Sequence, residues 1–150
     1  MLYDEEMMLK AIELAKKALE MGECPVGAII IDKEGNIIGE GYNRRENDNS
    51  PTAHAEIIAI EAAAKYLNSW RLSDCTLYVT LEPCPMCAGA IINSRLKRVV
   101  YGAFDDKGGA CASVVNLFEL PFNHKPLVRS RVLEEECGKL LTGFFRELRK

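Results

Sequence analysis

One histidine and two cysteines have the types and spacing of ligands for a catalytic zinc ion. His54 and Glu56 lie in the segment PTAHAE, and Cys84 and Cys87 lie in PCPMC, thirty residues further on. Three protein ligands leave the fourth position of a tetrahedral Zn²⁺ open for water, as in catalytic zinc sites. The carboxylate of Glu56 is the proton acceptor that such a water needs. The pattern therefore predicts metal-assisted hydrolysis.

The charges of the expected ligands support this chemistry. Two thiolates and a neutral imidazole offset the charge of Zn²⁺, and zinc binding lowers the pKa of water from about 15.7 toward about 7. The site is then expected to hold hydroxide near neutral pH. In this interpretation Glu56 takes a proton from the attacking water and passes it on to the substrate or to the leaving group.

A closed structural zinc site is the alternative interpretation of a C-x-x-C pair. It needs a fourth protein ligand. The candidates have no paired spacing; they are Cys24, Cys75, Cys111, Cys137 and His124. A redox role for the pair would not explain His54 or Glu56. The catalytic interpretation is therefore favoured.

The local elements have to present these side chains correctly. Cys84 and Cys87 are three residues apart, so they share a face at the start of a helix whose first turn contains Pro85. The helix dipole there favours thiolates. Residues i and i+2 of a helix point to opposite sides, so His54 and Glu56 can face one metal only if His54 lies near a helix start. We expect a helix from about His54 to Leu67, with Thr52 as its N-cap.

Hydrophobic periodicity predicts the remaining elements. A first helix ends at Gly22, and residues 26–31 and 37–42 form a hairpin. Strands at 76–80 and 98–101 flank the helix at 85–94, and this order predicts a parallel βαβ unit. The other predictions are loops at 43–52 and 103–112, a short helix at 113–118, a fifth strand at 127–132 and a last helix with an apolar stripe from Cys137 to Leu148.

The composition is that of a globular domain. The chain has 150 residues, of which 48% are hydrophobic and 27% are charged, and this length favours a single domain, residues 1–150. The acidic start does not resemble a secretory signal, and no apolar run is long enough to cross a membrane. We therefore expect a cytoplasmic protein with reduced thiols. Cys24, Cys75, Cys111 and Cys137 are expected to be small buried hydrophobic residues.

The net charge of −3, from 19 basic and 22 acidic residues, argues mildly against a polyanionic partner. Local basic clusters weaken this argument, because they could bind a polyanion, although each could also be an ordinary solvated face. They comprise Arg44 with Arg45, Arg95 with Lys97 and Arg98, Arg129 with Arg131, and Arg146 with Arg149 and Lys150.

These motifs resemble those of a known family. H-x-E with P-C-x-x-C is similar to the signature of zinc-dependent nucleobase deaminases, a superfamily that includes cytosine, guanine and deoxycytidylate deaminases. Over nearly its whole length the chain resembles the tRNA-specific adenosine deaminases. The features that favour a tRNA enzyme within the superfamily are Asn123-His124 and the C-terminal Phe144-Phe145.

The resemblance implies hydrolytic deamination of adenosine to inosine at the wobble position of a tRNA anticodon stem-loop. It implies a three-layer α/β/α fold, cytidine-deaminase-like, with a central mixed sheet of about five strands. It also implies a homodimer with active sites close to the interface, and one Zn²⁺ per subunit. The implied site roles are zinc ligation by His54, Cys84 and Cys87, proton transfer by Glu56, and substrate contacts by Asn43, Asp105 and His124.

The residues leave other interpretations open. Asn43 could simply end a strand, Asp105 could form a turn, and His124 could be an ordinary surface histidine. A deaminase of free guanine or of a cytosine derivative is the main alternative function. A non-catalytic zinc scaffold that acts through dimerisation is a further one, which the presence of Glu56 argues against.

Overall fold

A mixed β-sheet forms the centre of the protein in a computed structural model that describes residues 2–149. Its strand order is β2-β1-β3-β4-β5. The first three strands in this order pair antiparallel, and β3, β4 and β5 pair parallel. The bounds are Gly27–Ile31 for β1, Ile37–Tyr42 for β2, Thr76–Leu81 for β3, Arg98–Ala103 for β4 and Leu127–Arg129 for β5.

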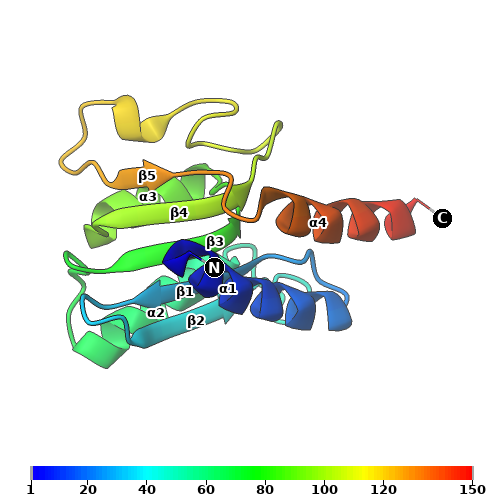
Figure 1. The fold of residues 1–150 in the computed structure, drawn as a ribbon, viewed down its shortest axis with the longest axis horizontal. Helices are drawn as coiled ribbons and strands as arrows, with labels where there is room; N and C mark the ends of the chain where they lie inside the picture. Colours follow the sequence, from blue (N-terminus) through cyan, green and yellow to red (C-terminus); the bar gives the residue numbers. More distant parts are fainter. Residues whose placement is uncertain (1, 150) are drawn as a thin grey trace.

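Helices cover both faces of this sheet (Figure 1). Helices α1 and α4 pack on one face, and α2 and α3 lie side by side on the other. Their bounds are Tyr3–Glu20 for α1, Ala55–Leu67 for α2, Pro85–Ser94 for α3 and Glu134–Leu148 for α4. This arrangement confirms the predicted three-layer α/β/α fold, the hairpin and the parallel βαβ unit.

Strand β1 shows why the sheet needs two helical layers. Its sequence, GAIII, has no alternation of polar and apolar residues, and all five residues are buried. Ile29 and Ile30 point to opposite faces, and each is 0% exposed. Unbroken apolar strands of this kind occur where both faces of a sheet are covered.

Small residues let α2 approach the sheet closely. A Cβ added to Gly39 or Gly41 of β2 would overlap the carbonyl oxygens of Ala59 and Ala55 on α2. The helix in turn presents Ala55, Ala59 and Ala63, all fully buried. This packing of alanines on glycines fixes the position of the start of α2, where the site lies.

Two predicted elements are shorter in the structure. The helix predicted at 113–118 is reduced to one 3-10 turn, η1, at Leu117–Glu119. The N–H of Leu117 donates to the Ala110 carbonyl at 2.9 Å, whereas a helix from 113 would need it to donate to Ser113. The strand predicted at 127–132 ends at Arg129. Arg131 and Leu133 have φ angles of +67° and +52°, which turn the chain away from the sheet and into α4.

A buried carboxylate ties α1 to the sheet. Asp4, 6% exposed, accepts hydrogen bonds from the Tyr78 hydroxyl at 2.7 Å, from Arg98 at 3.0 and 2.6 Å, and from Arg129 at 2.6 Å. These bonds, led by that from Arg98, hold the pKa of Asp4 well below its usual range although burial opposes them. Arg98 and Arg129, which belong to two of the basic clusters in the sequence, are therefore paired with Asp4.

Within residues 2–149, no helix is long and apolar enough to span a bilayer.

Candidate metal centre and substrate pocket

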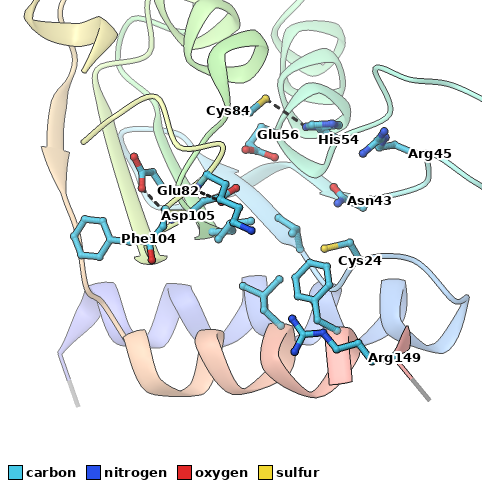
Figure 2. A pocket seen from close by; sticks show the side chains of 16 residues that line it. Cys24, Asn43, Arg45, His54, Glu56, Glu82, Cys84, Phe104, Asp105 and Arg149 are labelled. Atoms are coloured by element: carbon cyan, nitrogen blue, oxygen red, sulfur yellow. Dashed lines mark hydrogen bonds between the residues drawn. The ribbon is translucent and has the colours of Figure 1, made fainter. Parts of the chain in front are cut away.

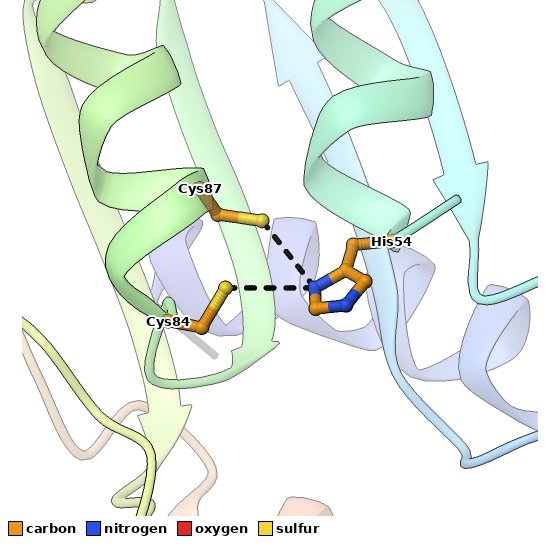
Figure 3. A group of neighbouring side chains, drawn as sticks. All are labelled: His54, Cys84 and Cys87. Atoms are coloured by element: carbon orange, nitrogen blue, oxygen red, sulfur yellow. Dashed lines mark hydrogen bonds between the residues drawn. The ribbon is translucent and has the colours of Figure 1, made fainter. Parts of the chain in front are cut away.

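The starts of two helices bring three candidate ligands together (Figure 3). His54 occupies the N-cap position of α2, and Cys84 that of α3. The Nδ1 atom of His54 lies 3.6 Å from Sγ of Cys84 and 3.5 Å from Sγ of Cys87. The prediction that Thr52 caps α2 is wrong, because the N-cap residue is His54, two residues later. That shift lets His54 and Glu56 face the same point.

These three donors fit a zinc ion. Their ligand atoms lie within 4.8 Å of one another, and tetrahedral Zn²⁺ with Zn–S of about 2.3 Å and Zn–N of about 2.0 Å has N···S separations of about 3.5 Å. Both cysteines lie at the positive end of the α3 dipole. Hydrogen bonding from Cys87 lowers the pKa of Cys84 to about 4, against the effect of burial. The set has the thiolate and imidazole chemistry that zinc prefers.

Glu56 lies beside this cluster without belonging to it. It is in the first turn of α2, is 4% exposed, and lines the pocket in front of His54 and Cys84 (Figure 2). Burial raises its pKa to about 7, while His54 and Cys87 beside it favour the charged form. A carboxyl group with a pKa near neutrality can both accept and donate a proton.

Asn43 faces the same pocket from the end of β2. Its Oδ1 accepts the backbone N–H of Ala55, the first residue of α2, at 2.8 Å. The amide oxygen therefore satisfies a free N–H of the helix start. The amide N–H₂ group is left as a donor for the pocket that Asn43 lines.

The pocket has a volume of about 600 Å³, within the range of small-ligand sites. Leu141 and Phe145 of α4, with Arg149 directly after the helix, form one side of it. Other side chains that line the pocket are Cys24, Arg45, Glu82, Phe104, Asp105, Asp106 and Lys107.

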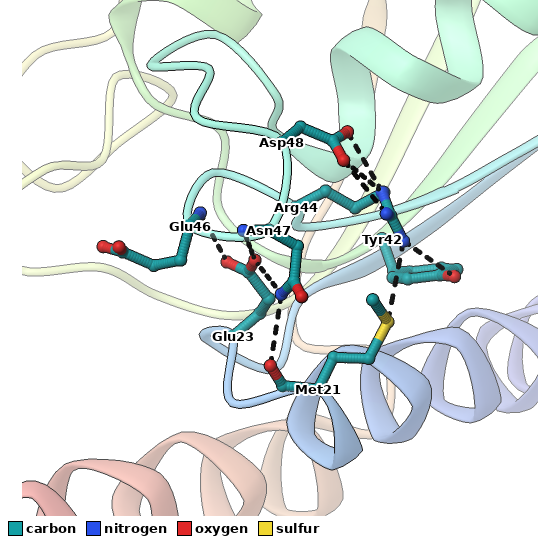
Figure 4. A network of polar contacts seen from close by, with 7 residues as sticks. All are labelled: Met21, Glu23, Tyr42, Arg44, Glu46, Asn47 and Asp48. Atoms are coloured by element: carbon teal, nitrogen blue, oxygen red, sulfur yellow. Dashed lines mark hydrogen bonds and ion pairs between the residues drawn. The ribbon is translucent and has the colours of Figure 1, made fainter.

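Another buried carboxylate, that of Glu23, holds the loop that carries Arg45 (Figure 4). Glu23, 2% exposed, accepts the N–H of Glu46 at 3.2 Å and that of Asn47 at 2.7 Å, as well as the Asn47 side chain. In the same loop Arg44 is bonded to Asp48 at 3.0 Å. Arg44 is thus engaged in an ion pair, whereas Arg45 lines the pocket.

Asp105 and His124, two of the predicted substrate contacts, lie in different parts of the structure. Asp105 lines the pocket, and its carboxylate also accepts the N–H groups of Lys107 and Gly108, so it forms a turn as well. His124, predicted to contact the substrate, is not among the residues that line this pocket. Its Nε2 lies 2.6 Å from the Leu96 carbonyl oxygen, before the start of β4, whereas the pocket lies at the other end of that strand.

Several pocket residues carried no usable signal in the sequence. Cys24 was expected to be a buried hydrophobic residue, but it is only partly buried and lines the pocket. Cys75, Cys111 and Cys137 are buried as expected, and all six cysteines are free. Phe104 and Leu141 look like ordinary core residues, since their place on the pocket depends on how the last third of the chain folds back.

The fold and the site together define a zinc-dependent deaminase. Residues 1–103 match the family model for the cytidine and deoxycytidylate deaminase zinc-binding region. The chain is 54% identical to the tRNA-specific adenosine deaminase of Bacillus subtilis, over 100% of this chain and 93% of that protein. It is 52% identical to that of Haemophilus influenzae, over 99% and 86%. The chain therefore belongs to the tRNA-specific adenosine deaminases.

Solved structures agree with this assignment. A structure from a study of A-to-I editing by tRNA:A34 deaminases at the wobble position superposes with a TM-score of 0.88 at 43% identity, covering 91% of this chain and 99% of that one. A guanine deaminase from Nitrosomonas europaea superposes with a TM-score of 0.78 at 25% identity, covering 93% and 83%. The tRNA enzyme is the nearer of these two relatives.

Proposed function

We propose that this protein hydrolyses adenosine to inosine at the wobble position of a tRNA anticodon. The observation that carries the proposal is the meeting of His54, Cys84 and Cys87 beside buried Glu56 at the floor of the pocket. Water adds its oxygen to C6 of the adenine ring, and the C6 amino group leaves as ammonia. The whole reaction consumes one water and needs no redox partner.

In this proposal His54, Cys84 and Cys87 hold one Zn²⁺ per subunit, which, when bound, makes water acidic enough to be a nucleophile at neutral pH. Glu56 accepts a proton from the attacking water and delivers it to N1 of the ring. It then carries a proton to the departing amino group. Asn43 orients the base with its amide N–H₂ group, which the bond from Ala55 to its oxygen keeps turned toward the pocket.

An adenine stacked in an anticodon loop cannot reach the floor of the pocket, so the base has to be flipped out. Three exposed cations on the pocket lining are placed to bind the phosphates on either side of it: Arg45, Lys107 and Arg149. Arg44, also a candidate in the sequence, is paired with Asp48. Lys150, a further candidate, lies outside the described residues.

The remaining parts of the proposal concern assembly and location. The family resemblance supports a homodimer of a single deaminase domain, residues 1–150. A tRNA substrate supports a cytoplasmic location. Arg149, directly after α4, adds an exposed cation to the pocket lining, which supports a substrate with phosphates over a free base.

The test compares an anticodon stem-loop that has adenosine at the wobble position with free guanine, cytosine and cytidine. Inosine in the RNA and ammonia release are measured with zinc-loaded protein. We expect inosine at the wobble position and no turnover of the free bases. Rapid deamination of a free base without inosine in the RNA would instead assign the protein to the small-molecule deaminases.

A further inference from the structure

The carboxylate of Glu82 binds both ends of a loop that forms one side of the pocket. Glu82 directly follows β3 and is 2% exposed. Its Oε1 accepts the N–H of Asp105 at 3.0 Å and the hydroxyl of Ser113. Its Oε2 accepts three successive N–H groups, from Cys111 at 3.1 Å, Ala112 at 2.8 Å and Ser113 at 2.9 Å.

A glycine lets the loop backbone lie directly on this carboxylate. Gly109 is buried, and a Cβ added there would overlap the Cδ and both oxygens of Glu82. The overlap involves the carboxylate that the five donors surround, so the side chain has no free direction in which to move. Position 109 therefore accepts only glycine while Glu82 keeps its bonds.

The segment between the two ends is stiff. The N–H of Gly109 bonds to the Asp105 carbonyl at 2.8 Å, and the Asp105 carboxylate accepts the N–H groups of Lys107 and Gly108 at 3.3 and 3.1 Å. Residues 105–109 thus form one turn. Three of its residues, Asp105, Asp106 and Lys107, line the pocket, so their positions depend on where the ends of the turn are attached.

We propose that Glu82 is a positioning residue for the RNA substrate: by binding both ends of the 104–113 loop, it sets where Asp105 and Lys107 meet the nucleotides around the flipped adenosine. The proposal rests on the proposed function. Glu82 takes no part in the chemistry. All five donors to its carboxylate are groups of the protein itself, and leaving buried N–H groups without an acceptor is costly. The carboxylate is therefore fully occupied in holding the loop.

The variant Glu82→Gln isolates one end of the loop. An amide has a single oxygen, which three backbone N–H groups retain at the Oε2 position. The N–H₂ group then lies at the Oε1 position, where the Ser113 hydroxyl can rotate to accept from it but the N–H of Asp105 cannot. We therefore expect the segment at Asp105 to be released while residues 111–113 stay attached.

For Glu82→Gln we expect the KM for the wobble-adenosine stem-loop to rise about tenfold, kcat to stay within about threefold of the wild-type value, and the zinc content to be unchanged. Backbone hydrogen exchange should become faster at residues 104–108. A merely structural role would lower the melting temperature or the zinc content without this separation of KM from kcat.

Gly109→Ala tests the same contact from the loop side. It should reproduce the rise in KM and the faster exchange while Glu82 itself is intact. The matched control is Gly138→Ala on α4, where an added Cβ meets nothing within 4 Å; it should leave both kinetic constants unchanged.

The outcomes separate this proposal from the proposed function. If wild-type protein forms no inosine, the proposed function fails, whatever the variants do. If wild-type protein is active and Glu82→Gln loses zinc, loses kcat at constant KM, or changes nothing, the positioning role is overturned. If Glu82→Gln does not fold, Gly109→Ala is measured in its place, and failure of both to fold assigns Glu82 to folding and overturns the proposal.

Discussion

The side chain of Asn43 and the backbone of Ala55 are joined by a hydrogen bond of 2.8 Å, with the Asn43 oxygen as acceptor. This bond connects the end of β2 to the first residue of α2, directly after His54. It places the amide oxygen of Asn43 at the start of α2 and the amide N–H₂ group in the pocket. One asparagine therefore serves both the candidate metal centre and the candidate substrate site.

The two halves of the Asn43 side chain can be tested separately. Asn43→Asp keeps an oxygen for the Ala55 N–H and removes the N–H₂ donor, whereas Asn43→Ala removes both. We expect Asn43→Asp to keep its zinc content and melting temperature while kcat/KM on the stem-loop falls by about 10- to 100-fold, the usual effect of one lost polar contact. Asn43→Ala should lose stability as well. Equal activity of wild type and Asn43→Asp would remove Asn43 from the substrate site.

Removing a cysteine of the cluster should remove the metal. Cys84→Ala or Cys87→Ala leaves two donors, and we expect less than one tenth of the wild-type zinc content with reduced solubility, because metal binding is coupled to folding at such sites. Metal analysis of purified protein measures this directly. Cys75→Ala, at a buried cysteine outside the cluster, is the control and should retain one zinc per subunit. Absorption spectroscopy that shows four protein ligands would contradict an open site.

Glu56→Ala should separate metal binding from turnover. The carboxylate is not among the three candidate ligands, so zinc and fold should be kept. Turnover should fall at least about 10²-fold, the usual scale for a lost general acid–base, and by more if the group is used at several steps. Inosine formation is measured under single-turnover conditions. Near-normal turnover of a zinc-loaded variant would exclude a proton-transfer role.

Binding of the stem-loop should weaken as salt is added. For contacts to single-stranded phosphates, the slope of log K against log salt is about −0.7 per contact. The double variant Arg45→Ala, Arg149→Ala should therefore make this slope less steep by about 1.4 if each side chain makes one contact. Zinc content should not change. Lys33→Ala, in the β1–β2 turn at the opposite end of the hairpin, is the matched control. An unchanged slope in the double variant would exclude both arginines as phosphate ligands.

Asp4 should make stability depend on acid pH. Hydrogen bonds led by that from Arg98 lower its pKa in the folded protein, so its contribution is complete above the unfolded pKa of about 3.9 and is lost as pH falls through the folded pKa. We expect Asp4→Asn to reduce the free energy of unfolding by about 2 kcal/mol at pH 5–7. The difference from wild type should narrow below about pH 4. Denaturant unfolding at each pH measures it, and a difference independent of pH down to 3 would contradict this account.

Local patterns in the sequence were enough to predict most of the elements and the chemistry. The spacing of Cys84 and Cys87 around Pro85 required a helix start, and the i, i+2 spacing of His54 and Glu56 required another, and both are present. The order of strand, helix and strand between residues 76 and 101 predicted the parallel pairing of β3 and β4. These inferences depend only on neighbours along the chain, whose geometry follows from the backbone.

The tertiary structure alone decided which distant groups meet. Nothing in the sequence near Glu82 indicates that it binds residues 105 and 111–113, and nothing near Asn43 indicates that it bonds to Ala55. Whether α4 borders the pocket, and whether His124 reaches it, depended in the same way on how the chain after β4 folds back. A buried polar side chain bonds to whichever donors the packing brings to it, and that packing is set by contacts far apart in the sequence, which spacing along the chain does not encode.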